Sequence, residues 1–114
     1  MLPTKQTVEA LLKVAKTQNC SQANQTLTKL TYLYLGENEI SDIKPLSNLT
    51  KLTSLELWGN KISDIKPLSN LTKLTSLSLG GNQISDIKPL SNLTNLTSLT
   101  LWKIKSAISN LCLI

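Results

Sequence analysis

Residues 49–70 have the sequence LTKLTSLELWGNKISDIKPLSN, and residues 71–92 repeat it with only three substitutions. The same pattern occupies residues 27–48, and a fourth copy begins at Leu93 but departs from the pattern after Trp102. Self-similarity at a fixed period of 20 to 50 residues is typical of a solenoid, in which each unit packs against its neighbours. The sequence therefore predicts one domain built on a 22-residue unit, with repeats at 27–48, 49–70 and 71–92 and a partial repeat at 93–102.

Each complete copy contains the pattern L-x-x-L-x-L-x-x-N-x-I, as at Leu30, Leu33, Leu35, Asn38 and Ile40. This is the leucine-rich-repeat pattern, with isoleucine in its last position. The two alternating leucines point inward from a short strand, whereas the residue between them points outward. Strands of successive repeats stack in parallel, about 4.8 Å apart. The predicted fold is an α/β, right-handed leucine-rich-repeat solenoid with these strands on its concave face.

The second half of each repeat predicts the turn and the convex face. An asparagine ends each strand, and its amide can bond backbone groups that the turn leaves unpaired. We interpret these residues as a structural ladder: Asn38, Asn60 and Asn82. The segment ISDIKPL then follows at 40–46, 62–68 and 84–90. Ser41 and Asp42 are suitable caps and Pro45 fixes φ near a helix start, so we expect one or two turns of 3₁₀ or α-helix.

A different composition precedes the repeats, and residues 1–26 are predicted to be a helical cap. Apolar residues recur at helical spacing over 4–17, with Thr4 or Thr7 as candidate N-cap. The expected apolar face is formed by Val8, Leu11, Leu12 and Ala15. A second short helix is expected around 21–25. A terminal repeat exposes its apolar edge unless another segment covers it, which is the role we predict for this segment.

The repeat and its helical cap closely resemble those of the bacterial internalin-type leucine-rich-repeat proteins, over about residues 4–102. The resemblance implies a protein partner bound on the concave sheet face, in a family whose members are often secreted or surface-attached. The segment Met1–Gln6 lacks the charged region and apolar stretch of a signal peptide, so the sequence does not assign a localisation.

Comparison of the repeats with one another indicates where a partner would bind. Most of their differences fall on outward-facing strand positions or on the loop that follows. Exposed Tyr and Trp on a rigid sheet bury a large area at a small loss of conformational entropy. The candidate binding residues are therefore Tyr32, Tyr34, Glu37, Glu56, Trp58, Ser76, Ser78, Thr100 and Trp102. The alternative is drift among duplicated repeats wherever the core leaves a position unconstrained.

The composition argues against several other functions. All twelve positive charges are lysines and the net charge is +5, but the lack of arginine disfavours specific nucleic-acid recognition. Histidine is absent, which removes the commonest general base and metal ligand. We therefore predict no enzyme, no cofactor, no metal site and no membrane span. Two alternatives stay open: a structural fragment of a longer repeat protein without a ligand, and a weak binder of anionic surfaces through its excess lysines.

The last segment, 103–114, does not continue the repeat. A back-translation of this segment, shifted by two bases, encodes NQISDIKPLSN, which is the missing half-repeat. We hypothesise that a single-base frameshift produced this tail and shortened a longer array. Cys112 would then be accidental, and about four repeats would separate it too far from Cys20 for a disulfide. Cys20 is then a small buried cap residue, or one of a pair whose partner was lost upstream. Apolar residues of the tail recur at helical spacing, so one alternative is that the tail folds over the last strand: Ile104, Ala107, Ile108 and Leu111. The other is an exposed strand edge, which predicts edge-to-edge self-association.

Overall fold

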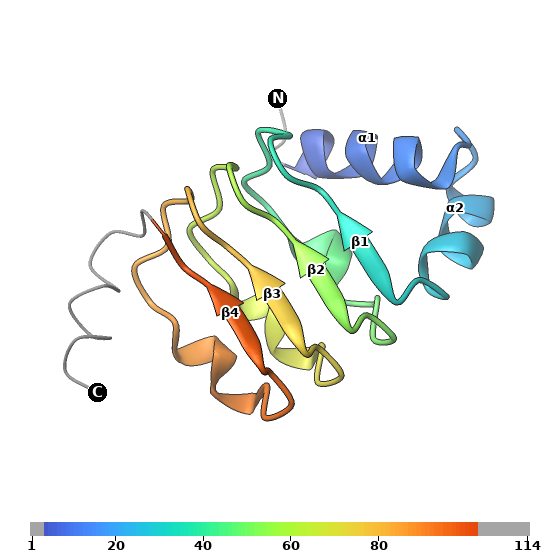
Figure 1. Ribbon diagram of the computed structural model, residues 1–114. Helices are drawn as coiled ribbons and strands as arrows, with labels where there is room; N and C mark the ends of the chain where they lie inside the picture. The colour runs from blue at the N-terminus through green and yellow to red at the C-terminus, as the bar shows by residue number, and fades with distance from the viewer. Residues whose placement is uncertain (1–3, 103–114) are drawn as a thin grey trace, which may run out of the picture.

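The computed structural model describes residues 4–102, which form a helical cap followed by four stacked coils (Figure 1). Two α-helices come first, and each coil then contributes one short strand. A 3₁₀ helix, labelled η, lies between consecutive strands. In chain order the elements are α1 Thr4–Ala15, α2 Cys20–Leu27, β1 Tyr32–Tyr34, η1 Lys44–Leu46, β2 Ser54–Glu56, η2 Lys66–Asn70, β3 Ser76–Ser78, η3 Lys88–Asn92 and β4 Ser98–Thr100.

The four strands form one parallel sheet in the order β1-β2-β3-β4. Each residue pairs with the residue one repeat further on, as Leu33 does with Leu55 and Leu55 with Leu77. The sheet bonds continue beyond the strands, because the Leu35 N–H donates to the Glu56 carbonyl at 2.8 Å. Thr53 adds a side-chain hydrogen bond between the first two repeats, because its hydroxyl donates to the Thr31 carbonyl at 3.1 Å. The register confirms the parallel stack that the repeat predicts.

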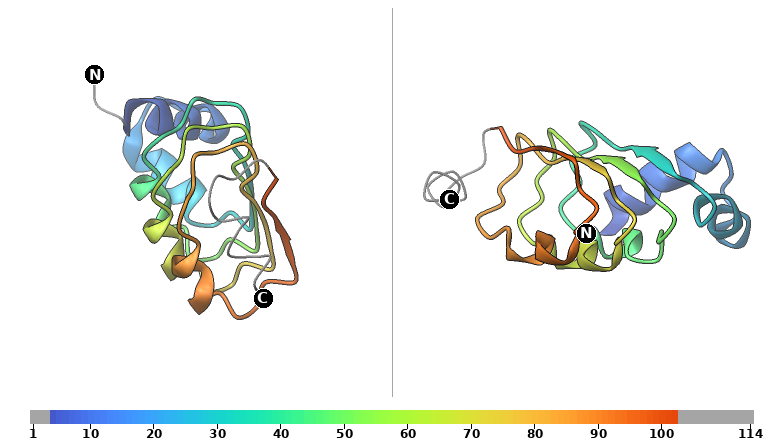
Figure 2. Two further views of the ribbon diagram at one scale, coloured as in Figure 1. Left: turned by 90° about the vertical axis from the view of Figure 1, so that its left-hand side faces the viewer. Right: turned by 60° about the horizontal axis from the view of Figure 1, so that its bottom comes forward.

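The core lies between the sheet and the 3₁₀ helices, which occupy the opposite side of each coil (Figure 2). Leu33, Leu55 and Leu77 are at most 1% exposed, because Leu33 is covered by the helical cap and the second coil, and the other two by a coil on each side. The isoleucines and leucines of the second half-repeat close the core from the convex side, as Ile62, Ile65 and Leu68 do in the second repeat. The predicted solenoid, with strands on one face and 3₁₀ turns on the other, is confirmed.

The convex turn begins one residue later than the sequence suggests. The N-cap position of η1 is Ile43, which makes no side-chain cap bond, and Pro45 lies at the start of the helix. Asp42 acts from the preceding position, because its Oδ1 accepts the Lys44 N–H at 3.0 Å. Equivalent bonds recur in the next two repeats. The aspartate column therefore satisfies backbone groups at the start of each 3₁₀ helix.

The cap contains the two predicted helices, but its buried face differs from the expectation. Thr7 does not cap α1: it lies inside the helix, is 0% exposed, and its hydroxyl donates to the Asp42 carbonyl. Ala10 and Leu11 are buried beside it, whereas Val8 is 37% exposed. Burying Thr7 is tolerated because the hydroxyl finds an acceptor in the first repeat. That bond joins the cap to the solenoid.

The short loop between α1 and α2 uses two local signals. Lys16 adopts φ +58°, a left-handed conformation that ends α1 two residues before the predicted limit. Asn19 is the N-cap of α2, because its Oδ1 accepts the N–H groups of Ser21 and Gln22. Cys20 is the first residue of α2 and is exposed, so the expectation that it is a buried cap residue is wrong.

The fourth strand differs from the other three in burial. All of β4 is exposed, and Leu99 is 39% exposed although it occupies the same inward position as Leu77. Among residues 4–102 no strand pairs with the outer edge of β4. An open strand edge is a template for pairing with another chain, so self-association at this end stays a prediction. The tail 103–114, including Cys112 and the proposed frameshift, lies outside the described residues.

Candidate functional site

The outward side chains of the strands form two rows across the concave face. The first row contains Tyr32 of β1 and a serine in each later strand: Ser54, Ser76 and Ser98. The second row is Tyr34, Glu56, Ser78 and Thr100. Large side chains therefore concentrate over the first two repeats. We call the group of Tyr32, Tyr34, Glu56 and Trp58 the aromatic patch.

Tyr32 and Glu56 are joined diagonally across β1 and β2. Tyr32 is 52% exposed, and its hydroxyl donates a hydrogen bond to the Glu56 carboxylate. This bond, together with slight desolvation and the negative charge of Glu56, raises the pKa of Tyr32 above its ordinary value of about 10. The tyrosine therefore stays a donor, and it holds the Glu56 carboxylate in a fixed orientation on the sheet.

Tyr34 and Trp58 form a second diagonal contact. Their ring centroids are 5.9 Å apart and the planes meet at 75°, the edge-to-face geometry that aromatic quadrupoles favour. Tyr34 is 45% exposed and Trp58 is half-buried. Tyr34 is also the register partner of Glu56. The Tyr32–Glu56 hydrogen bond and the Tyr34–Trp58 ring contact therefore both join the first repeat to the second, and the four side chains are neighbours on the concave face.

The Trp58 ring lies over the backbone of the preceding repeat. A Cβ on Gly36 would come within 2.7 Å of Trp58 Cε2, closer than side chains approach. Trp102 lies in the same way over Gly80, where a Cβ would come within 2.4 Å of its indole. The tenth position of successive repeats is therefore Gly36, Trp58, Gly80 and Trp102, in which each tryptophan occupies the space that a glycine leaves. Comparing the repeats in the sequence shows that this position varies between glycine and tryptophan. It does not show that each indole needs the space left by the glycine of the preceding repeat.

Replacing Gly36 by alanine should displace the Trp58 ring, because the new methyl group occupies the place of the indole. The ring is at the surface and can rotate away, so we expect only about 1 kcal/mol of destabilisation. The measurement is the indole N–H resonance of Trp58 together with tryptophan emission. Gly80→Ala is the matched control, since it should displace Trp102 and leave Trp58 in place. An unchanged Trp58 resonance in Gly36→Ala would contradict the steric assignment.

Glu37 borders the patch in the turn after β1. Its N–H donates to the Trp58 carbonyl at 3.0 Å, and a Cβ on Gly59 would be 3.0 Å from its Cγ. The backbone of Glu37 has φ +58°, whereas the equivalent positions carry Gly59 at +70° and Gly81 at +71°. A glutamate in this left-handed conformation costs of order 1 kcal/mol relative to glycine. The first repeat thus holds a carboxylate beside Trp58 in a conformation that favours glycine.

The remaining predicted binding residues do not join this patch. Ser76 and Ser78 are half-buried on β3, and Thr100 is exposed on β4. Trp102 is 46% exposed and follows β4, two repeats away from Trp58. Small side chains on the third repeat separate the two tryptophans. Four of the predicted binding residues therefore form the aromatic patch, and Glu37 borders it. The other four lie further along the concave face, over the third and fourth repeats.

The asparagines lie beneath the turns rather than on the binding face. Asn60 is 5% exposed, and its Oδ1 accepts the N–H groups of Asn38 and Ile40 in the preceding repeat. Its Nδ2 donates to the carbonyls of Leu35 and Leu57, one in each repeat. Asn82 bonds the second and third repeats in a similar way: Ile62, Leu57, Leu79 and Gly80 are its partners. Asn38 is half-buried, and its Nδ2 donates within its own turn, to the Gly36 carbonyl.

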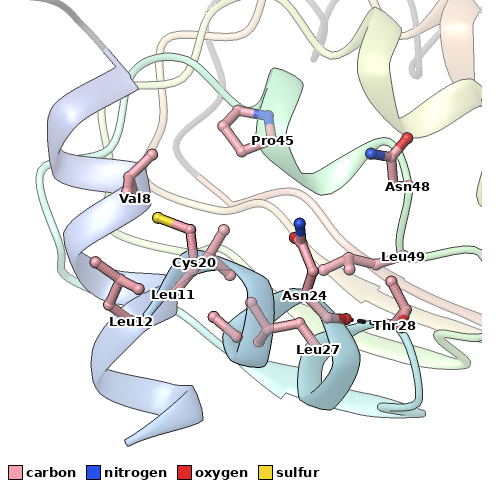
Figure 3. A pocket seen from close by; sticks show the side chains of 11 residues that line it. Val8, Leu11, Leu12, Cys20, Asn24, Leu27, Thr28, Pro45, Asn48 and Leu49 are labelled. Carbon is pink, nitrogen blue, oxygen red and sulfur yellow. Dashed lines mark hydrogen bonds between the residues drawn. The ribbon is translucent and has the colours of Figure 1, made fainter. Parts of the chain in front are cut away.

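A separate cavity of about 150 Å³ lies between the cap and the first convex turn (Figure 3). Val8, Leu11 and Leu12 of α1 form one side, and Pro45 and Leu49 form the other. Cys20 and Asn24 of α2 complete its lining, with the Cys20 side chain beside Leu11. Apart from the Cys20 thiol, the lining consists of apolar side chains and neutral polar ones, and none of it is charged.

Within residues 4–102, no three His, Cys, Asp or Glu side chains are grouped closely enough to hold a metal ion. None of the helices in this range combines the length and apolar character needed to cross a membrane.

The two-copy leucine-rich-repeat family model matches residues 28–70 and 72–112. The chain therefore belongs to the leucine-rich-repeat family, whose repeats typically mediate protein–protein interaction. Repeats of this kind are interaction modules rather than enzymes. No curated protein sequence gives a significant match.

Among solved structures the chain is similar to bacterial internalins. Internalin InlF of Listeria monocytogenes is 35% identical, with a TM-score of 0.78 over 88% of this chain and 30% of that one. Internalin C2 of the same species is 41% identical, with a TM-score of 0.69 over 77% of this chain and 38% of that one. A leucine-rich-repeat protein of Leptospira interrogans is 32% identical, with a TM-score of 0.64 over 72% of this chain and 22% of that one. The predicted internalin-like resemblance is confirmed, and the chain spans well under half the length of these relatives.

Proposed function

We propose that this chain binds a protein partner through its concave face, with the aromatic patch as the main contact. The observation that supports this most strongly is the grouping of Tyr32, Tyr34 and Trp58 on adjacent strands. Tyr32 and Tyr34 are about half exposed, although the equivalent positions of later repeats hold serine, glutamate or threonine. Exposed aromatic side chains on a rigid sheet are the residues that most often dominate a protein interface.

The sheet is well suited to present these rings. Its strands are fixed by parallel backbone bonds and by the core beneath them, so the rings lose little freedom when a partner covers them. Ser76, Ser78 and Thr100 extend the surface as small polar contacts, and Trp102 adds a second aromatic contact at its far end. A partner of ordinary size buries roughly 800 Å² on each side, an area that needs more than the patch alone.

Replacing Tyr32, Tyr34 and Trp58 together by alanine should abolish partner capture from a bacterial lysate. Each ring that anchors an interface contributes about 2 kcal/mol or more, so three should lower affinity beyond detection. Val14→Ala is the control, because Val14 is 37% exposed on α1 and its loss removes apolar surface away from the sheet. Circular dichroism establishes that both variants remain folded.

Other outcomes distinguish the alternative functions. Capture that survives the triple substitution but fades with salt would indicate an anionic surface bound through lysines. The absence of any partner for the wild-type chain would favour a structural fragment without a ligand. Either result would contradict the proposed use of the concave face.

A further inference from the structure

We propose that the aromatic patch recognises a basic segment of its protein partner, with a lysine or arginine side chain seated between Tyr34, Trp58 and two carboxylates. This inference rests on the proposed function and specifies the chemistry of the partner. It follows from the charge that surrounds the two rings, which is opposite in sign to that of the whole chain.

Glu56 and Glu37 occupy positions next to the ring pair, one on β2 and one in the turn after β1. Glu56 is the register partner of Tyr34 and precedes Trp58 by two residues, so it shares their face of the sheet. Glu37 follows β1, and its backbone N–H donates to the Trp58 carbonyl. A cation over these rings would meet the negative face of an aromatic system and the neighbouring carboxylates.

Within residues 4–102, neither carboxylate forms an ion pair with a lysine. The one ion pair among residues 4–102 joins Lys5 and Glu9, on α1. Glu56 instead accepts the Tyr32 hydroxyl through Oε2, which orients the group and leaves Oε1 available for a second donor. A neutral donor of this kind keeps the full negative charge on the patch.

The lysines of the chain lie elsewhere. Lys29, Lys51 and Lys73 precede the strands, and Lys44, Lys66 and Lys88 lie on the convex side. Lys61 lies in the turn after Trp58, where its backbone N–H donates to the Ile40 carbonyl, and within residues 4–102 it forms no ion pair with Glu37 or Glu56. The concave face over the first two repeats therefore carries two carboxylates that form no ion pair within residues 4–102, in a chain of net charge +5. Charge complementarity favours a basic partner over an acidic or purely apolar one.

The test is selection of a random 12-residue phage-displayed peptide library on the immobilised wild-type chain. The expected result is enrichment of peptides with Lys or Arg beside an apolar residue. Synthetic versions should bind Glu37→Gln/Glu56→Gln about tenfold or more weakly, because charge-assisted bonds are lost while Tyr32 keeps an acceptor. Exchanging the peptide lysine for norleucine should weaken binding to the wild-type chain similarly. The control, Glu9→Gln/Asp86→Asn, changes the net charge equally but on α1 and on the third convex turn, away from the patch, and should leave affinity unchanged.

The other outcomes separate this inference from the proposed function. If Tyr34→Ala/Trp58→Ala loses the peptides but Glu37→Gln/Glu56→Gln binds them as tightly as wild type, the concave face binds and the basic partner is wrong. Enrichment of acidic or uncharged peptides contradicts the inference in the same way. If neither double variant changes binding, or no peptide is enriched at all, both proposals fail.

Discussion

Replacing Asn60 by alanine should lower the free energy of unfolding by at least about 3 kcal/mol, because one buried amide joins two repeats. Its Oδ1 accepts the N–H groups of Asn38 and Ile40, and its Nδ2 donates to carbonyls of both repeats. Alanine would leave two N–H groups and one carbonyl of the first repeat without these partners. Each unsatisfied buried group costs about 1–3 kcal/mol. Urea unfolding followed by circular dichroism measures the loss.

Asn70→Ala provides a matched control within the same repeat. Asn70 is exposed at the end of η2, so the same chemical change should alter stability by no more than about 0.5 kcal/mol. Asn82→Ala should resemble Asn60→Ala, since Asn82 bridges the second and third repeats. A loss below about 1 kcal/mol for Asn60→Ala would contradict a ladder that holds the coils together.

The repeat made most of the fold predictable, because its period forces identical environments on equivalent residues. Leu33, Leu55 and Leu77 are buried in one file, and the segment ISDIKPL forms a 3₁₀ turn each time it occurs. The cap has no such repetition. Its helical spacing predicts two helices, but not that Thr7 is buried in place of Val8. That choice depends on an acceptor, the Asp42 carbonyl, in a segment 35 residues away.

The sequence predicts which residues of the candidate site lie on the outward face, but not which side chains contact one another. Strand alternation places Tyr32, Tyr34 and Glu56 on the outward face, as the structure has them. It does not reveal that side chains lean diagonally, Tyr32 onto Glu56 and Trp58 onto the backbone of Gly36. These contacts depend on the rotamers of neighbouring side chains, which a one-dimensional pattern does not contain. The glycines that accommodate the indoles were therefore missed as part of the site.

Leu55 and Leu99 occupy the same position in the second and fourth repeats, and they should respond very differently to replacement by alanine. Leu55 is 0% exposed, enclosed by the coils on both sides, whereas Leu99 is 39% exposed. Truncating an enclosed leucine removes its transfer free energy and leaves a cavity, which together cost about 3 kcal/mol or more. Truncating Leu99 leaves no closed cavity, so we expect a loss of about 1 kcal/mol.

The comparison of Leu55→Ala with Leu99→Ala holds the chemical change constant and varies only the neighbours. Leu77→Ala completes the series: Leu77 is 1% exposed between β2 and β4, so its loss should equal that of Leu55 within about 1 kcal/mol. Thermal and urea unfolding of the three variants provide the measurement. Equal losses at all three positions would mean that Leu99 is as enclosed in solution as Leu55. A graded loss would show instead that each coil is stabilised by its neighbours, as a one-dimensional stack of repeats requires.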